Sequence, residues 1–171
     1  MTLDKLINKF INGDASAFDK IYKLTQKSVY YVAISILHDV SLAEDVMQST
    51  YMSVLKNIHS YALGTNAGAW IIKIAKNEAI NLKKLTMKEQ NFDEAINPAV
   101  FGVCELETCG KLTDLAKRLL PEDEFTILML VIVCGYKRKE IAKMLDMPLS
   151  TITWKYQNAL SKMRKALEKE E

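Results

Sequence analysis

Apolar residues recur with helical spacing along almost the whole chain, and no alternating stretch indicates a β-strand. The first amphipathic face ends at Asn12-Gly13, a helix stop, and similar segments follow at about 14–37, 41–58, 69–87 and 112–119. A very apolar run at 127–133 precedes Gly135. A chain of 171 residues that is 49% apolar can bury one substantial core or two small ones. The sequence therefore predicts an all-α protein.

Polar residues at the start of several of these segments predict helix caps. Asp14 stands before the second helix, Ser41 with Glu44 forms a capping-box pattern before the third, and Ser150 stands at the start of the last. Lys137 occupies a position where serine or threonine would cap better, so the helix after it is expected to fray.

Helical periodicity weakens between Thr86 and Gly110, where Asn97-Pro98 and Gly102 interrupt it. We expect two small helical domains at 1–88 and 112–171, joined by a linker at 89–111.

The segment 135–160 has the layout of a helix-turn-helix DNA reader. A short helix is stopped at Asp146-Met147-Pro148, and the second helix has a buried stripe that begins at Ile152 and Tyr156. Its outer face is polar and carries no carboxylate from 148 to 167, although helix pairs of this kind also occur in bundles that never touch DNA. The candidate DNA contacts here are Arg138, Lys139, Ser150, Thr151, Thr153, Trp154, Lys155, Gln157, Asn158 and Lys162.

A second candidate DNA surface lies on the helix predicted at 69–87. Residues 67–88 hold five lysines against the single Glu78, and a stripe of lysine and asparagine runs beside Trp70. Aromatic stacking with a cationic track suits single-stranded nucleic acid, whereas a solvated helix face is the plainer interpretation.

Other function classes find little support. His38 and His59 are isolated, the three cysteines have no ligand-spaced partners, and no glycine-rich phosphate loop is present. We therefore expect no enzyme, metal, cofactor or small-molecule substrate. No run is long enough to insert in a membrane and the N-terminus is unlike a signal peptide, so a cytoplasmic location is expected.

Three blocks, at 43–52, 70–84 and 120–164, resemble the extracytoplasmic-function (ECF) sigma factors of the sigma-70 family, which direct bacterial RNA polymerase to promoters. The resemblance implies core polymerase and promoter DNA as partners, and leaves an anti-sigma factor open as a third. It implies polymerase contacts at Asp45, Gln48, Tyr51 and Met52. It implies minus-ten contacts at Tyr61, Thr65, Asn66, Trp70, Lys73, Lys76, Asn77, Asn81 and Lys84, and it assigns the helix-turn-helix to the minus-thirty-five element.

The chain departs from this family on the second helix of the reader. Thr153, Trp154, Asn158 and Ser161 occupy positions that are often basic, so electrostatic anchoring by this domain should be weak. The alternative function is a polymerase-independent helix-turn-helix regulator whose N-terminal helices act as a sensor. Such a regulator would have no need for an exposed cationic stripe beside Trp70.

Overall fold

The structure is a computed structural model that describes residues 2–89 and 107–168. Within these residues it contains α-helices and one short 3-10 helix, and no strand. The elements are α1 (Leu3–Ile11), α2 (Ser16–Leu37), α3 (Val40–Asn57), η1 (Ile58–Ser60), α4 (Ala67–Glu89), α5 (Glu107–Leu119), α6 (Glu122–Ile132), α7 (Arg138–Met144) and α8 (Leu149–Leu167). The all-α prediction is confirmed. Most of the predicted linker, residues 90–106, lies outside the described residues.

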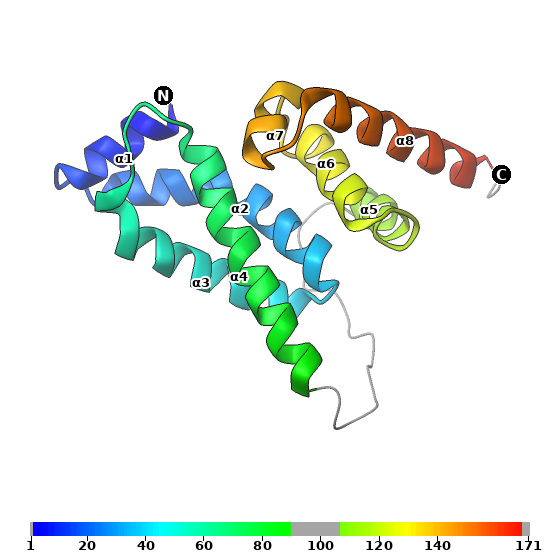
Figure 1. The fold of residues 1–171 in the computed structure, drawn as a ribbon, viewed down its shortest axis with the longest axis horizontal. Helices are drawn as coiled ribbons and strands as arrows, with labels where there is room; N and C mark the ends of the chain where they lie inside the picture. The colour runs from blue at the N-terminus through cyan, green and yellow to red at the C-terminus, as the bar shows by residue number, and fades with distance from the viewer. Residues whose placement is uncertain (1, 90–106, 169–171) are drawn as a thin grey trace.

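Helices α1 to α4 form one bundle around α2, which contacts the other three (Figure 1). The buried side of α2 runs from Ala17 to Ile36 and meets apolar residues of α3 and α4 such as Val54 and Ile71. Burial of these side chains supplies the main stabilisation of the bundle. The bundle thereby fixes which faces of α3 and α4 point outward.

Helices α5 to α8 form the second bundle, in which α6 and α8 are the main contact. Every residue of α6 from Glu124 to Leu130 is buried, because α6 packs against α8 on one side and against α2 on another. A helix that is enclosed in this way is apolar nearly all round. No helix among the described residues is long and apolar enough to cross a membrane.

The two bundles contact each other directly through α2 and α6. The Thr126 hydroxyl donates a hydrogen bond to Ser35 Oγ at 2.6 Å, and both side chains are buried. The rings of Tyr31 and Phe125 lie 6.4 Å apart beside this hydrogen bond. One hydrophobic cluster is continuous across the contact. The described residues therefore show the two bundles in a closed arrangement.

Two of the predicted caps are wrong in the first bundle. Helix α3 is capped by Asp39, whose carboxylate accepts the Leu42 backbone N–H at 2.9 Å, so Ser41 lies inside the helix. The α3 start falls two residues earlier because Asp39 has the extended backbone of a cap residue. Asp14 does not cap α2, because Ala15 occupies the cap position and no side chain caps that helix.

The second bundle corrects the expected ends of α7 and α8. Ser150 lies inside α8, because Pro148 occupies the cap position and no side chain caps this helix. The start of α7 is tied down, since the Glu140 carboxylate accepts the Lys137 backbone N–H at 2.7 Å. Gly135, at φ +71°, makes the turn between α6 and α7, in the left-handed region that favours glycine.

Candidate nucleic-acid and polymerase interfaces

One face of α4 presents an exposed strip of nitrogen-bearing side chains. Lys73, Asn77, Asn81 and Lys84 follow one another at intervals of four, four and three, which places them on the same side of the helix. All four are exposed, and none of the ion pairs between described residues involves Lys73 or Lys84. We call these four residues the α4 strip. They can donate to phosphates and to base edges.

The loop before α4 is anchored by an aromatic pair. Trp70 is half-buried, and its ring lies 5.0 Å from that of Tyr61. Tyr61 is buried and donates its hydroxyl hydrogen bond to Asp4, and burial raises its pKa. The side-chain oxygen of Asn66 caps α4 by accepting its third backbone N–H at 3.0 Å. Thr65 is left exposed between these anchors. The loop therefore has a fixed base and an open tip.

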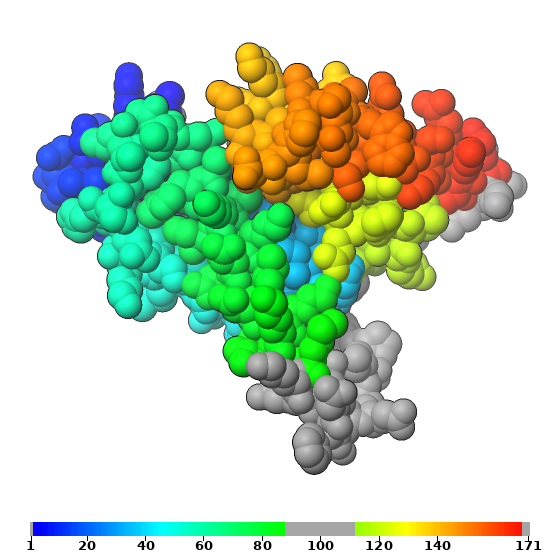
Figure 2. All heavy atoms as spheres, in the orientation of Figure 1, coloured from blue at the N-terminus to red at the C-terminus, as the bar shows by residue number. Residues whose placement is uncertain are grey.

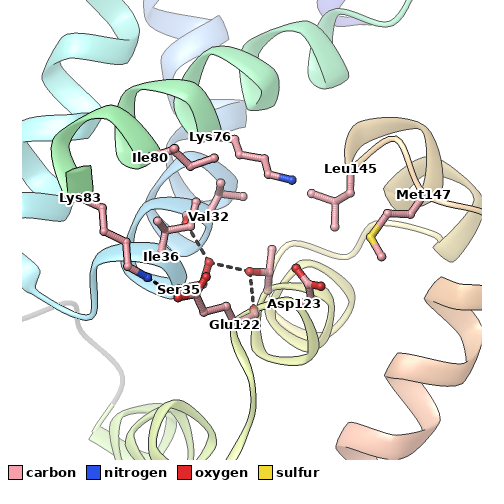
Figure 3. Close-up of a pocket in the computed structure, with 11 residues that line it drawn as sticks. Val32, Ser35, Ile36, Lys76, Ile80, Lys83, Glu122, Asp123, Leu145 and Met147 are labelled. Atoms are coloured by element: carbon pink, nitrogen blue, oxygen red, sulfur yellow. Dashed lines mark hydrogen bonds and ion pairs between the residues drawn. The ribbon is translucent and has the colours of Figure 1, made fainter. Parts of the chain in front are cut away.

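The flank of α4 that faces the second bundle forms one wall of a cleft of about 260 Å³ (Figure 3). Lys76 and Lys83 project into it from α4, and Glu122 and Asp123 reach it from the start of α6. Lys83 forms an ion pair with Glu122. The apolar lining comes from Val32, Ile36, Ile80, Leu145 and Met147. Lys76 thus lies beside the strip and forms no ion pair with another described residue, and its contact with minus-ten DNA stays a prediction.

The expected polymerase contacts lie on α3. Asp45, Gln48 and Met52 are exposed and share one helical face, and the Met52 side chain is 69% exposed. Tyr51 is buried, and its hydroxyl lies 2.8 Å from Thr25 Oγ1. Burial raises the pKa of Tyr51 to about 12. Tyr51 can therefore support this face from beneath but does not present its ring at the surface.

The reader helix α8 divides its polar residues between two directions. Ser150, Trp154 and Gln157 are exposed, with Trp154 62% exposed, and Arg138 and Lys139 are exposed on α7. Thr151 and Thr153 are half-buried beside them. In Figure 2 the orange atoms of α7 and α8 and the green atoms of α4 are both visible on one face of the molecule.

The remaining predicted α8 contacts turn toward the start of α6. We call Glu122, Asp123 and Glu124 the acidic turn. Lys155 pairs with Asp123 at 2.9 Å and Lys162 with Glu124 at 2.9 Å, and Asn158 donates to Glu124 at 2.7 Å. Glu124 is only 5% exposed, so these two partners satisfy a buried carboxylate. The three α8 side chains hold α8 against α6.

Two family models match the chain in the order of these bundles. Sigma-70 region 2 matches residues 21–86, and Sigma-70, region 4 matches residues 113–163. These segments carry α2 to α4 on one side and the helix-turn-helix on the other. The chain belongs to the sigma-70 family of sigma factors.

Individual relatives agree with this assignment. The sigma factor is 24% identical to the ECF RNA polymerase sigma factor SigW of Bacillus subtilis (strain 168), over 98% of its own length and 97% of that protein. It is 30% identical to SigM of the same organism, over 48% of its own length and 50% of that protein. The sigma factor is a promoter-specificity subunit that binds core RNA polymerase and promoter DNA. The family consists of non-enzymatic DNA-recognition subunits.

Solved structures share the fold of the sigma factor. The sigma factor RpoE from Bartonella quintana, in complex with the anti-sigma factor NepR, aligns with a TM-score of 0.65 at 23% identity, over 88% of this chain and 96% of that one. CnrH in complex with the cytosolic domain of CnrY aligns with a TM-score of 0.69 at 15% identity, over 98% of both chains.

Sequence reasoning assigned no role to two α4 residues of the sigma factor that contact other helices. Glu78, which had no assigned role, accepts a hydrogen bond from Ser53 Oγ at 2.8 Å and so joins α4 to α3. Lys83 was not a candidate, although it forms the ion pair with Glu122. The lysine-rich pattern of 67–88 contained a signal for Lys83, but only the folded chain shows which cation meets α6.

Among the described residues of the sigma factor, no three His, Cys, Asp or Glu side chains are grouped to hold a metal ion. Cys134 is half-buried, and burial raises its pKa to about 11, which disfavours the reactive thiolate. Cys104 lies outside the described residues.

Proposed function

We propose that this sigma factor divides its work between the segments 1–88 and 112–171, with 89–111 as the tether. The first segment docks on core polymerase and captures the minus-ten element, and the second reads the minus-thirty-five element. The observation that carries this proposal is the exposed α4 strip, whose two lysines are unpaired among the described residues. A sensor domain, the alternative, would not require it. We further propose that the protein acts in the cytoplasm with polymerase, and that an anti-sigma factor is a third partner.

Docking on polymerase is assigned to the exposed face of α3. Asp45, Gln48 and Met52 offer a carboxylate, an amide and an apolar side chain within two helical turns. This mixture suits a protein interface, where an apolar centre is framed by polar contacts. Tyr51 is a positioning residue, because its hydrogen bond to Thr25 and its ring contacts fix the rotation of α3 on α2.

Capture of the minus-ten element is assigned to the α4 strip and the loop before it. Lys73 and Lys84 neutralise phosphates, and Asn77 and Asn81 bond to base edges that strand separation exposes. Trp70 offers its partly exposed indole ring for stacking, while the Tyr61 ring packs against it. The open loop tip at Thr65, held by Asn66, receives a flipped base, and the unstacking costs a few kcal/mol that binding must offset.

Reading of the minus-thirty-five element is assigned to α7 and α8. Arg138 and Lys139 bind phosphates, and the outward residues Ser150, Thr151, Thr153, Trp154 and Gln157 face the bases in the major groove. Direct DNA contacts by Lys155, Asn158 and Lys162 stay a prediction, since the acidic turn holds these side chains.

In the closed arrangement, the α4 strip and α8 cannot bind their two promoter elements at the same time. Elements near minus ten and minus thirty-five are about 25 base pairs apart, or roughly 85 Å at 3.4 Å per pair. Helix α4, with 23 residues, is only about 35 Å long, and α6 packs directly on the first bundle. We therefore propose that the bundles separate on polymerase. The 17 residues between the end of α4 and the start of α5 can span roughly 60 Å when extended, and the two bundles themselves cover the remaining distance.

Run-off transcription with purified core polymerase tests the proposal. Wild-type protein should redirect polymerase to a new start site. Asp45→Ala should lose polymerase binding in a pull-down, whereas Lys73→Ala should keep it but open less DNA by permanganate footprinting. Lys23→Ala, which removes an exposed lysine from α2, is the matched control and should behave as wild type. If the wild-type protein binds duplex promoter DNA tightly without polymerase and never changes the start site, the regulator hypothesis replaces this one.

A further inference from the structure

The outward side of α8 carries no unpaired positive charge along its first three turns. From Leu149 to Ser161 its cation is Lys155, and Lys162 follows directly after. Both are paired with the acidic turn. What remains outward is a hydroxyl at Ser150, an indole at Trp154 and an amide at Gln157. This surface is neutral, in contrast to a DNA-recognition helix that binds through arginine side chains.

Apolar side chains border this neutral surface. Leu149 is 47% exposed and Trp154 is 62% exposed, although both side chains are large and apolar. Leu149 and Thr153 line a surface hollow together with Val131 and Tyr136. Leu149 and Thr153 bring apolar groups to the hollow, and Trp154 exposes its ring on another side of α8, so this end of the helix offers apolar groups to a partner.

The partner must also carry negative charge at the edge of this hollow. Lys137, Arg138 and Lys139 form its other wall, and all three are exposed. No carboxylate of the described residues forms an ion pair with any of them. Arg138 lies over the Tyr156 ring at 5.9 Å from its centre, which directs the guanidinium along the same side. The three cations at the rim of the hollow can bind DNA phosphates, and its apolar floor can contact apolar groups of the neighbouring bases.

The chemistry of this surface discriminates between base pairs. Guanine is best read by arginine or lysine, and neither is free on the outward side of the first three turns of α8. Adenine is read by the amide of glutamine or asparagine, and the thymine methyl group is read by apolar contact. Gln157 supplies the amide, and Leu149 and Trp154 supply the apolar contact.

We propose that this sigma factor reads A·T base pairs with the first turns of α8. Thymine methyl groups pack against Leu149, Thr153 and Trp154, and Gln157 bonds an adjacent adenine. Lys137, Arg138 and Lys139 hold the flanking phosphates. This inference rests on the proposed function of α8, and it names the bases that α8 recognises.

The test uses holoenzyme reconstituted from the full chain and core polymerase. A duplex library with six randomised upstream base pairs is selected for binding, and each thymine in the selected element is then replaced by uracil, which removes only the methyl group. The affinity of wild type should fall about fourfold for each methyl that packs on α8. Trp154→Ala should lose at least one of these methyl effects, because the contact is gone. Gln157→Ala should relax discrimination of adenine over guanine at one position by at least fivefold.

Leu167→Ala is the matched control, because Leu167 is also exposed on α8 but lies at its far end. It should keep every methyl effect. Selection of G·C pairs opposite α8, or an affinity unchanged by uracil in the wild type, would overturn this inference while leaving the proposed function intact. A holoenzyme that selects no upstream sequence at all would overturn both.

Discussion

Glu122 is the carboxylate that ties α6 to both α2 and α4, so its neutralisation should open the protein. It pairs with Lys83 (Figure 3), and its Oε1 lies 3.7 Å from His38 Nε2. Glu122→Gln keeps the size and hydrogen-bonding capacity of the side chain but removes the charge. The closed arrangement loses its Coulombic attraction while the Ser35–Thr126 hydrogen bond and the apolar contact remain.

The size of the effect follows from exposure. The side chains of Lys83, Glu122 and His38 are 31%, 44% and 45% exposed, so water screens both pairs. Partly exposed pairs contribute about 0.2–1 kcal/mol each. Burial is the main cause that lowers the pKa of His38, so it is mostly neutral at pH 7.5 and adds little. The ratio of open to closed molecules should therefore rise by a factor of about 1.4 to 5.

Single-molecule energy transfer can measure this ratio, with dyes at the exposed positions 23 on α2 and 165 on α8. Asp19→Asn is the matched control, since it removes an exposed carboxylate from α2 that forms no ion pair with another described residue. The difference between the two variants should fade near 1 M salt, where the screening length is about 3 Å. Equal open populations at low salt would show that Glu122 does not hold the bundles together.

Three further outcomes are expected in equilibrium unfolding experiments. Tyr51→Phe removes a buried hydrogen bond but leaves Thr25 bonded to a backbone carbonyl, so the free energy of unfolding should fall by about 1 kcal/mol; no change would contradict the contact. The pKa of His38 is lowered in the fold, so the unfolded chain binds its proton first and stability should decline as pH falls below about 6.5. His38→Asn, which tolerates the local φ of +56°, should flatten that decline, and an unchanged pH profile would refute the assignment. Glu140→Ala should cost about 1 kcal/mol by freeing the Lys137 N–H, and urea denaturation with the wild-type midpoint would exclude this cap.

Helix periodicity in the sequence predicted the all-α fold and most of the helices. It also marked the very apolar run at 127–133, whose first four residues are buried in α6, because such a run depends only on local composition. Predicted helix starts were less successful. Ser41 and Ser150 are good cap residues, but each is the second residue of its helix, because Asp39 and Pro148 occupy the cap positions. Several polar residues near a helix start compete for the cap, and local preference alone does not choose among them.

The amino-acid sequence by itself determined which helices form, which faces they bury and which family the chain resembles, because these properties arise from short-range spacing and residue type. Only the tertiary structure decided which polar residues are free to meet DNA. Lys73 and Arg138 remain exposed, while Lys83, Lys155 and Lys162 are occupied by the acidic turn. The reason is that an ion pair across 30 or more residues depends on how α6 packs against α4 and α8, and no local pattern encodes that distance.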